Sequence, residues 1–129
     1  MKNTQEYDIS EEIVINSIYN IRNIKVMFDF DLSGIYQVET RALKQAVRRN
    51  ANRFPNDFMF ELTKSEWQEV ITNCDNLPQT VKFSPVSPMA FTELGVSMLS
   101  SVLKSERAVM VNIQIMRVFH RITNIYSTF

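Results

Sequence analysis

Glycine is scarce in this sequence, which holds 2 glycines and 4 prolines among 129 residues. A β-sandwich needs many tight turns, and glycine and proline supply the backbone conformations that most tight turns require. The composition therefore argues against a turn-rich all-β fold. Because 45% of the residues are hydrophobic, a chain of this length can bury its own core and is expected to form one domain.

Composition excludes several other classes of protein. With 22% charged residues the chain has the balance of a globular protein and not of a disordered one. No apolar run approaches the roughly 20 residues that span a bilayer, and the acidic stretch from Met1 to Glu12 lacks the apolar segment of a signal peptide. A single cysteine, Cys74, and a single histidine, His120, cannot form a disulfide framework or a four-ligand zinc site. We therefore expect a reduced cytoplasmic protein without a metal or a cofactor.

Local patterns predict short strands and several helices. Two stretches rich in Ile, Val and Phe, 13–19 and 24–29, lie on either side of Asn20 and Asn23 and predict a β-hairpin. Further strands are expected at 58–62 and 89–91, helices at 31–36, 41–52, 64–73, 93–103 and 106 to about 126, and a loop at 76–88. The expected caps are Asp29 or Asp31 for the first helix and Thr40, Thr63, Thr92 and Ser105 for the others.

The expected fold is a small α+β domain with an N-terminal β-hairpin, short additional strands and about four to five helices, ending in a long C-terminal helix. Trp67 and the phenylalanines at 54, 58, 60, 83 and 91 are expected to form the core. Gly95 falls within a predicted helix, where close packing explains a glycine best.

The net charge is zero, with 14 basic and 14 acidic residues, but the charges are unevenly distributed. The segment from Thr40 to Phe54 has no acidic residue and carries five basic ones, Arg41, Lys44, Arg48, Arg49 and Arg53. This leaves 9 basic and 14 acidic residues for the rest of the chain, a net charge of −5. Charge concentrated on one element is typical of a phosphate-binding surface, and it also occurs on an ordinary solvated helix face.

A helix over 41–52 separates this segment into two faces. At about 100° per residue, one sector contains the polar residues Arg41, Lys44, Gln45, Arg48 and Asn52, and the opposite side carries Leu43, Ala46 and Val47. Arginine pairs with guanine or phosphate, and Gln or Asn pairs with adenine. We expect Arg41, Lys44 and Arg48 to face DNA, Arg49 and Arg53 to contact phosphate beside them, and Gln45 and Asn52 to read base edges.

Several blocks of sequence resemble one known family. They are Ile24–Asp29 with Asp31–Tyr36, Val38–Thr40 with Val47–Asn50 and Arg53–Pro55, Phe58–Thr63, Phe91–Val96 with Met98–Leu103, and Asn112–Phe119. In this order and spacing they resemble the phage-type "open reading frame six" N-terminal domain, a branch of the KilA-N and Bro-N superfamily. The resemblance implies a small α+β fold, a DNA-binding module of phages, bacterial mobile elements and large DNA viruses, and no catalysis.

The resemblance covers residues 13 to 120. Together with the patterns along the chain, it leads us to expect three parts. These are a mobile acidic lead-in over 1–12, a KilA-N-like DNA-binding core over 13–104 and a C-terminal helix over 105–129. The chain departs from the family in one place. Many members carry a basic, glycine-containing stretch before the Phe-Thr-Glu block, whereas Lys82 is the only charged residue within 77–88 here. If that loop contacts DNA in relatives, this chain has lost part of the contact.

The basic helix and the resemblance together predict a DNA-binding regulator of phage or mobile-element genes, located in the bacterial cytoplasm at the nucleoid. The hairpin would support the helix as a wing whose Arg22 and Lys25 reach the backbone of duplex DNA. No membrane or small-molecule partner is implied. The alternative is a protein-interaction or assembly domain whose basic helix binds an acidic partner.

Enzymatic functions have little support in the sequence. A metal-dependent nuclease would rest on Asp29 and Asp31 alone, and these aspartates fit a turn and a helix cap better. His120, Cys74 and the Ser100–Ser101 pair lack the neighbouring residues that would activate them, and no phosphate-binding glycine loop is present. We therefore expect no enzyme.

The C-terminal helix carries apolar residues at alternating spacings of three and four, namely Ala108, Val111, Ile115, Val118, Ile122, Ile125 and Phe129. This spacing is typical of a heptad repeat. A second stripe, Val109, Ile113, Met116 and Phe119, lies beside it. An apolar arc this wide predicts that one stripe packs on the domain and the other on a second copy. We expect a homodimer with Val111, Ile115, Val118, Ile122 and Ile125 at its interface, and a single broad core-facing stripe is the alternative.

Overall fold

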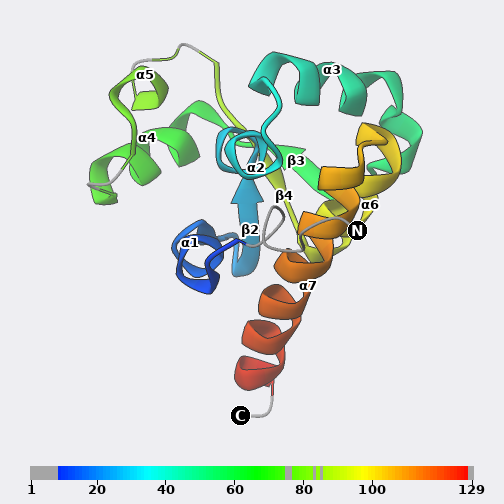
Figure 1. Ribbon diagram of the computed structural model, residues 1–129. Coiled ribbons are helices and arrows are strands. Elements are labelled where there is room, and N and C mark those ends of the chain that lie inside the picture. The colour runs from blue at the N-terminus through cyan, green and yellow to red at the C-terminus, as the bar shows by residue number, and fades with distance from the viewer. Residues whose placement is uncertain (1–8, 75–76, 83, 85, 128–129) are drawn as a thin grey trace.

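The computed structural model describes residues 9–74, 77–82, 84 and 86–127, and it confirms an α+β fold that ends in a long helix (Figure 1). The helices are α1 (Glu11–Asn16), α2 (Asp29–Tyr36), α3 (Thr40–Arg49), a 3₁₀ turn (Ala51–Arg53), α4 (Lys64–Asn73), α5 (Gln79–Lys82), α6 (Glu93–Leu103) and α7 (Glu106–Ser127). The strands are β1 (Ile18–Ile21), β2 (Ile24–Phe28), β3 (Met59–Glu61) and β4 (Met89–Phe91).

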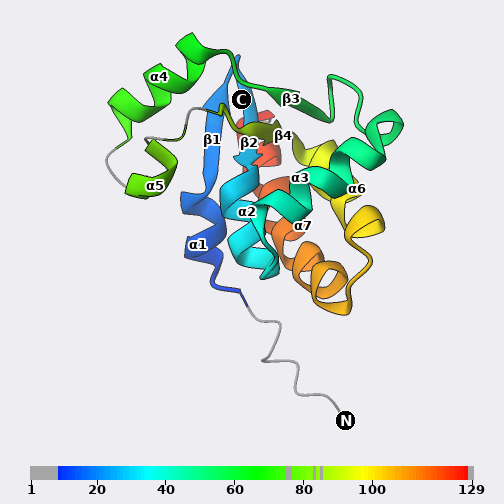
Figure 2. The same ribbon diagram turned by 90° about the horizontal axis from the view of Figure 1, so that it is seen from above.

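The four strands form one antiparallel sheet in the order β1-β2-β4-β3. Side chains alternate between its faces, so Val26 and Phe28 of β2 point to one side and Met27 points to the other. Helices α4 and α5 lie on the first side, and α2, α3, α6 and α7 lie on the second (Figure 2). The sheet is therefore the middle of three layers, and each face contributes to a hydrophobic cluster.

The predicted core aromatics are found in both clusters. Trp67 and Phe60 belong to the cluster under α4, and Phe54 and Phe91 belong to the larger cluster under α6 and α7. Phe58 is partly buried against the larger cluster. Phe83 lies outside the described residues.

The hairpin forms, but its first strand begins later than predicted. Residues 13–16 belong to α1 and not to a strand, although Ile13, Val14 and Ile15 favour a strand locally. The two-residue turn sets a register in which Ile18 pairs with Met27. In that register residue 16 would pair with Asp29, where α2 has already begun, so the earlier residues have no strand to join. They form a helix instead, and Val14 is buried against α7.

Three of the predicted helix caps are confirmed and two are wrong. Thr63 forms a capping box with Glu66, Thr92 accepts a hydrogen bond from the Gly95 amide, and Ser105 accepts one from the Ala108 amide. Thr40 is already part of α3, and its hydroxyl instead hydrogen-bonds that of Ser33 at 2.7 Å. Neither predicted aspartate caps α2, because the N-cap is Phe28 and no side chain caps that end.

Gly95 allows α6 to start directly against the backbone of the segment before β3. A Cβ atom at this position would lie 1.9 Å from the carbonyl oxygen of Phe58. Thr92 fixes the same contact, since its amide donates to the Phe58 oxygen at 3.0 Å and its hydroxyl donates to the Asp57 oxygen at 2.6 Å. The predicted close packing at Gly95 is confirmed.

A buried polar chain that the sequence did not reveal joins three helices. The Tyr36 hydroxyl of α2 donates to Asn112 Oδ1 of α7 at 2.5 Å, and Asn112 Nδ2 donates to the Val96 carbonyl of α6 at 2.8 Å. Asn112 is 4% exposed and Tyr36 is 1% exposed. A buried amide that has both its donor and its acceptor in use specifies how these helices pack.

The stripe assigned to a dimer interface packs inside the domain. Val111 and Ile115 are fully buried and Val118 is 6% exposed, all within the larger cluster, and Ile122 packs against that cluster. The side chain of Ile125 is outside the described part of the chain. The interface prediction is therefore wrong for Val111, Ile115 and Val118, because α1, α2 and α6 already cover them. It also follows that the core extends past residue 104 into α7.

The exposed apolar residues of α7 lie beside that stripe. Val109, Met110 and Ile113 are 46%, 38% and 42% exposed. Of the second predicted stripe, Phe119 is buried, Met116 is partly buried, and only Val109 and Ile113 are exposed. A second copy therefore stays a prediction, and it would have to use this other face.

Candidate nucleic-acid interface

Helix α3 is anchored by one face and presents the other to solvent. Leu43 and Val47 are buried in the larger cluster and Ala46 packs against it. This face contacts α2 and α6. The predicted apolar side of the basic helix is confirmed.

The outer face of α3 carries Arg41, Gln45 and Arg48. All three side chains are exposed, and together they line a shallow depression. Within the described residues none of the three takes part in a hydrogen bond or an ion pair. Arg49, at the end of the helix, is likewise exposed and unpaired in this part of the chain. The sequence analysis predicts that these four residues contact DNA, and the structure exposes all four on or beside one face of α3.

Lys44 does not belong to this outer face. Its ammonium lies 3.4 Å from Asp29 Oδ2, and its side chain is 16% exposed. The same Asp29 oxygen accepts the Met89 amide of β4 at 3.0 Å. The expectation that Lys44 faces DNA is therefore wrong, because the side chain turns inward to a buried carboxylate and ties α3 to α2 and the sheet.

Asp29 is buried, and Asp31, two residues later in α2, is half-buried. Burial raises the pKa of Asp29, and the Met89 amide and Lys44 oppose that shift. Burial and the neighbouring charge of Asp29 raise the pKa of Asp31 to about 7. Among the residues that the structure describes, no group of three or more His, Cys, Asp or Glu side chains is placed to hold a metal ion. Asp29 thus contributes to the packing of α3 through Lys44 and the Met89 amide.

The helix ends before Asn52, which changes the roles expected for the residues that follow. After Arg49 the chain turns through Asn50 into the 3₁₀ turn, so the helical projection that put Asn52 on the polar face does not apply. Arg53 donates to the Ser101 hydroxyl of α6 at 3.3 Å. Asn52 therefore does not continue the helical face that carries Gln45, and Arg53 contacts α6 within the domain.

The hairpin does not lie beside α3. Its turn precedes β2 and α2 follows β2, so the turn and the helices are at opposite ends of this strand, about 16 Å apart along five residues. Figure 1 shows β2 running from the hairpin towards α2, with α3 beyond it. Arg22 and Lys25 are therefore not brought together with the outer face of α3, and a contact between them and the DNA backbone stays a prediction.

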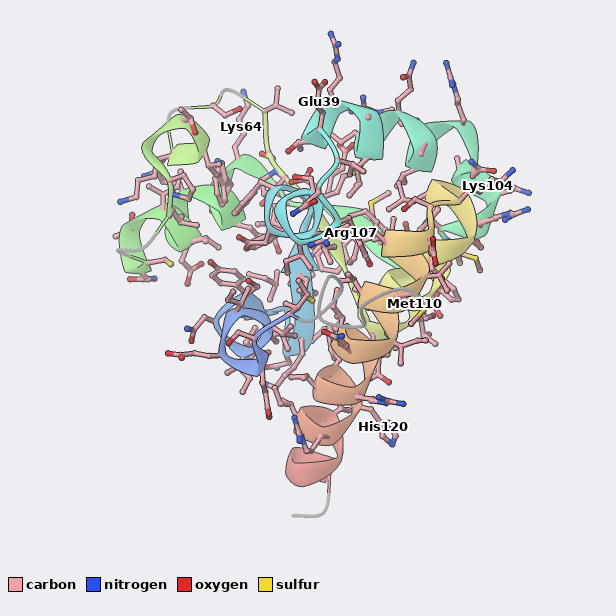
Figure 3. The ribbon with its side chains drawn as sticks, in the orientation of Figure 1. Glu39, Lys64, Lys104, Arg107, Met110 and His120 are labelled. Carbon is pink, nitrogen blue, oxygen red and sulfur yellow. The ribbon has the colours of Figure 1, made fainter. Side chains whose placement is uncertain are left out.

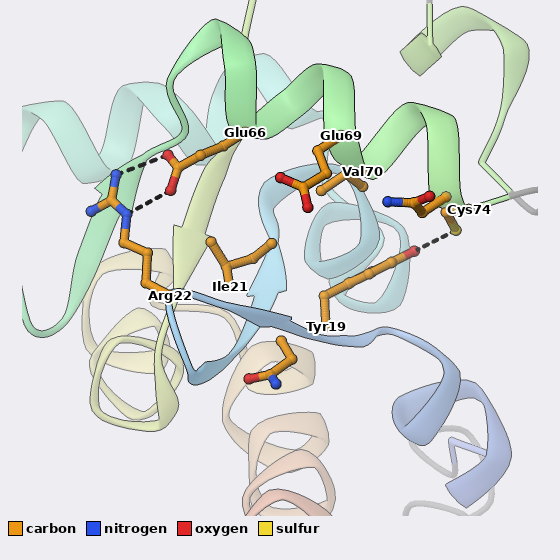
Figure 4. Close-up of a pocket in the computed structure, with 9 residues that line it drawn as sticks. Tyr19, Ile21, Arg22, Glu66, Glu69, Val70 and Cys74 are labelled. Carbon is orange, nitrogen blue, oxygen red and sulfur yellow. Dashed lines mark hydrogen bonds and ion pairs between the residues drawn. The ribbon is translucent and has the colours of Figure 1, made fainter.

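Arg22 serves the packing of the hairpin against α4. Its guanidinium donates to both carboxylate oxygens of Glu66, at 2.7 and 2.9 Å, and lies 4.2 Å from the centre of the Phe60 ring. Figure 4 shows this pair at one end of a pocket of about 300 Å³ between β1 and α4, with Tyr19 and Cys74 at the other end. The Arg22 hydrogen bonds, with that of the Thr63 amide, hold the pKa of Glu66 at about 2.

Part of the segment over 77–88, which carries Lys82 as its single charged residue, lies next to α3. Thr80, Ser84 and Val86 line a cavity of about 210 Å³ together with Thr40 and Lys44 of α3. The predicted loop here includes the short helix α5, and its Lys82 is half-buried. The segment thus adds one basic residue, Lys82, beside α3.

Figure 3 shows which end of the molecule carries this surface. Glu39, just before α3, and Lys104, at the end of α6, lie towards the end that carries α3, whereas His120 of α7 lies towards the opposite end. Lys104 is exposed and is a further cation at the α3 end. Glu39 is an exposed acid at the N-cap position of α3.

The fold and this site define a small α+β domain that presents a basic, solvent-facing helix. The family model described as the ORF6N domain matches residues 16–102, about two thirds of the chain, and the chain belongs to that family. This is the family that the sequence blocks resemble. No curated protein and no solved structure matches the chain. In the part of the chain that the structure describes, no helix is long and apolar enough to cross a membrane.

Proposed function

We propose that this protein is a DNA-binding module that holds duplex DNA against the outer face of α3 and catalyses no reaction on it. The observation that carries the proposal is the contrast between two sets of cations. Lys44 and Arg22 form ion pairs with carboxylates, and Arg53 hydrogen-bonds the Ser101 hydroxyl. Arg41, Arg48 and Arg49, by contrast, are exposed and unpaired among the described residues. Free guanidinium groups on one rigid helix suit a polyanion.

Membership of the ORF6N family supports the proposal, because the resemblance implies DNA binding. On the same ground we expect a regulator associated with phage or mobile elements, working in the bacterial cytoplasm at the nucleoid. The alternative partner is an acidic protein surface, which would be attracted by the same guanidinium groups. A titration with DNA distinguishes a DNA-binding module from an assembly domain, since an assembly domain would show no measurable binding of duplex DNA at low salt.

The test is a fluorescence-anisotropy titration of a labelled random-sequence duplex with the whole chain at low salt. Arg48→Ala should weaken binding, and Arg41→Ala/Arg48→Ala/Arg49→Ala should abolish it. The matched control is Arg117→Ala, which removes from α7 an exposed guanidinium that has no partner among the described residues. Arg48 and Arg117 are both on the surface, so neither single substitution is expected to change the free energy of unfolding by more than about 0.5 kcal/mol. A folded triple variant that binds as tightly as the parent would show that the DNA surface lies elsewhere.

A further inference from the structure

Three side chains form a row along the outer face of α3. Arg41, Gln45 and Arg48 are separated by four and three residues, which puts them one above another on a helix. With a rise of about 1.5 Å per residue, the row is about 10.5 Å long. The three side chains line one depression and have no partner within the described residues, so all three are available to the same ligand.

The length of the row matches a short run of base pairs. Successive base pairs of B-DNA are about 3.4 Å apart, so the first and the fourth are separated by about 10.2 Å. Along the helix axis Gln45 lies about 6 Å from Arg41 and about 4.5 Å from Arg48. When the two arginines lie over the outer base pairs of a four-base-pair step, the glutamine therefore lies over one of the two inner pairs.

The surroundings of the row allow α3 to approach the bases. Ala42, on one side, is exposed and short, and Lys44, on the other side, turns inward to Asp29. Arg49 follows Gln45 by one helical turn on the Ala42 side, at the end of the helix, where its long side chain can reach a phosphate beside the groove. A helix with its side chains is about 10–12 Å across, and the major groove is about 12 Å wide.

The chemistry of the row selects particular bases. A guanidinium donates two parallel hydrogen bonds to O6 and N7 of guanine, and a glutamine amide both donates to N7 and accepts from N6 of adenine. Resting on the proposed function, we infer that α3 reads a four-base-pair element in the major groove. Its two outer pairs are G·C, bound by Arg41 and Arg48, and one of its inner pairs is A·T, bound by Gln45.

The experiment starts with selection of a duplex library, randomised over eight base pairs, by the whole chain. The parent should enrich duplexes that contain two G·C pairs three steps apart with an A·T pair between them. The enriched duplex is then made with 7-deazaguanine at each outer position, which removes the N7 acceptor and leaves every phosphate in place. Each replacement should weaken binding by about five- to a hundredfold.

Two variants serve as internal controls. Gln45→Ala should lose the preference for the inner A·T pair while keeping both guanines. Arg49→Ala should weaken binding to selected and unselected duplexes by the same factor, because a phosphate contact carries no sequence information. If the parent binds DNA in a salt-dependent way but enriches no such element, or tolerates 7-deazaguanine, the inference is overturned and the proposed function stands. If the parent binds no duplex at all, both are overturned.

Discussion

The same substitution in two helices should change stability in opposite directions. Gly34 of α2 and Gly95 of α6 are both helical and neither has a positive φ, so alanine suits both backbones. A Cβ atom at Gly34 would have nothing within 4 Å, whereas a Cβ atom at Gly95 would lie 1.9 Å from the Phe58 carbonyl oxygen. Helix propensity alone predicts that Gly→Ala stabilises either site by about 0.5–1 kcal/mol.

At Gly95 the steric cost of the added Cβ atom is larger than the gain in helix propensity. The distance between the new Cβ atom and the Phe58 oxygen must increase by more than 1 Å, because Cβ atoms essentially never approach another heavy atom closer than 3.0 Å. The oxygen belongs to the backbone and cannot rotate away as a side chain could. Overpacking of this kind costs about 1–3 kcal/mol. Moving α6 also strains the Thr92 hydrogen bonds to Asp57 and Phe58, each of which contributes about 1 kcal/mol. We therefore expect Gly95→Ala to destabilise the fold by about 2–4 kcal/mol and Gly34→Ala to stabilise it by about 0.5–1 kcal/mol.

Urea unfolding followed by circular dichroism measures both changes in free energy. The midpoints should move in opposite directions while the slope stays the same, since neither change alters the area exposed on unfolding. Gly95→Ala should also lower the melting temperature. In a domain of this size a loss of about 1 kcal/mol lowers it by a few degrees, so the expected loss should lower it by several times that amount. A Gly95→Ala protein as stable as the parent would refute the account of how α6 is seated.

Three further predictions concern the core, the acidic pair and the state of association. Asn112→Ala should destabilise the protein by about 1–3 kcal/mol in the same urea assay, because it leaves the buried Tyr36 hydroxyl without its acceptor; an unchanged midpoint would count against the polar chain. The pKa of Asp31 is raised to about 7, above its unfolded value, so stability should fall as pH rises from about 4 to about 7. The Asp31→Asn protein should show a smaller fall, because the raised pKa of Asp29 acts in the same direction, and an equal fall in both proteins would contradict the assignment. Light scattering should show a dimer at micromolar concentration that Ile113→Glu converts to a monomer, and a parent that is already monomeric would end the dimer hypothesis.

Elements that depend on neighbouring residues in sequence were predictable. Thr63 and Thr92 each cap the helix that follows through an amide three residues ahead, and the sequence shows both partners. Helix α4 has the bounds expected from this pattern, Lys64–Asn73. The amphipathic character of α3 was also predictable, because the spacing of Leu43 and Val47 is visible in the chain.

Features that depend on distant residues were not predictable. Helical projection puts Lys44 at the edge of the polar sector, and only the fold shows that Asp29 lies within reach of it. The register of the hairpin is set by its turn, and only the start of α2 shows why the strand cannot begin before Ser17. The stripe on α7 indicates burial, but periodicity cannot tell whether the covering surface is the same chain or a second copy.

The salt dependence of DNA binding tests the central claim most directly. Lys44 and Arg53 have contacts within the domain, so Arg41, Arg48 and Arg49 leave about three phosphate contacts on a random duplex. The plot of log K against log salt should then have a slope of about −2.7. If Arg48 contacts phosphate in a random duplex, Arg48→Ala should reduce this slope by about 0.9, and Arg117→Ala should leave it unchanged. A parent whose binding does not depend on salt, or an Arg48→Ala protein with the parent's slope and affinity, would contradict the claim that α3 holds the DNA.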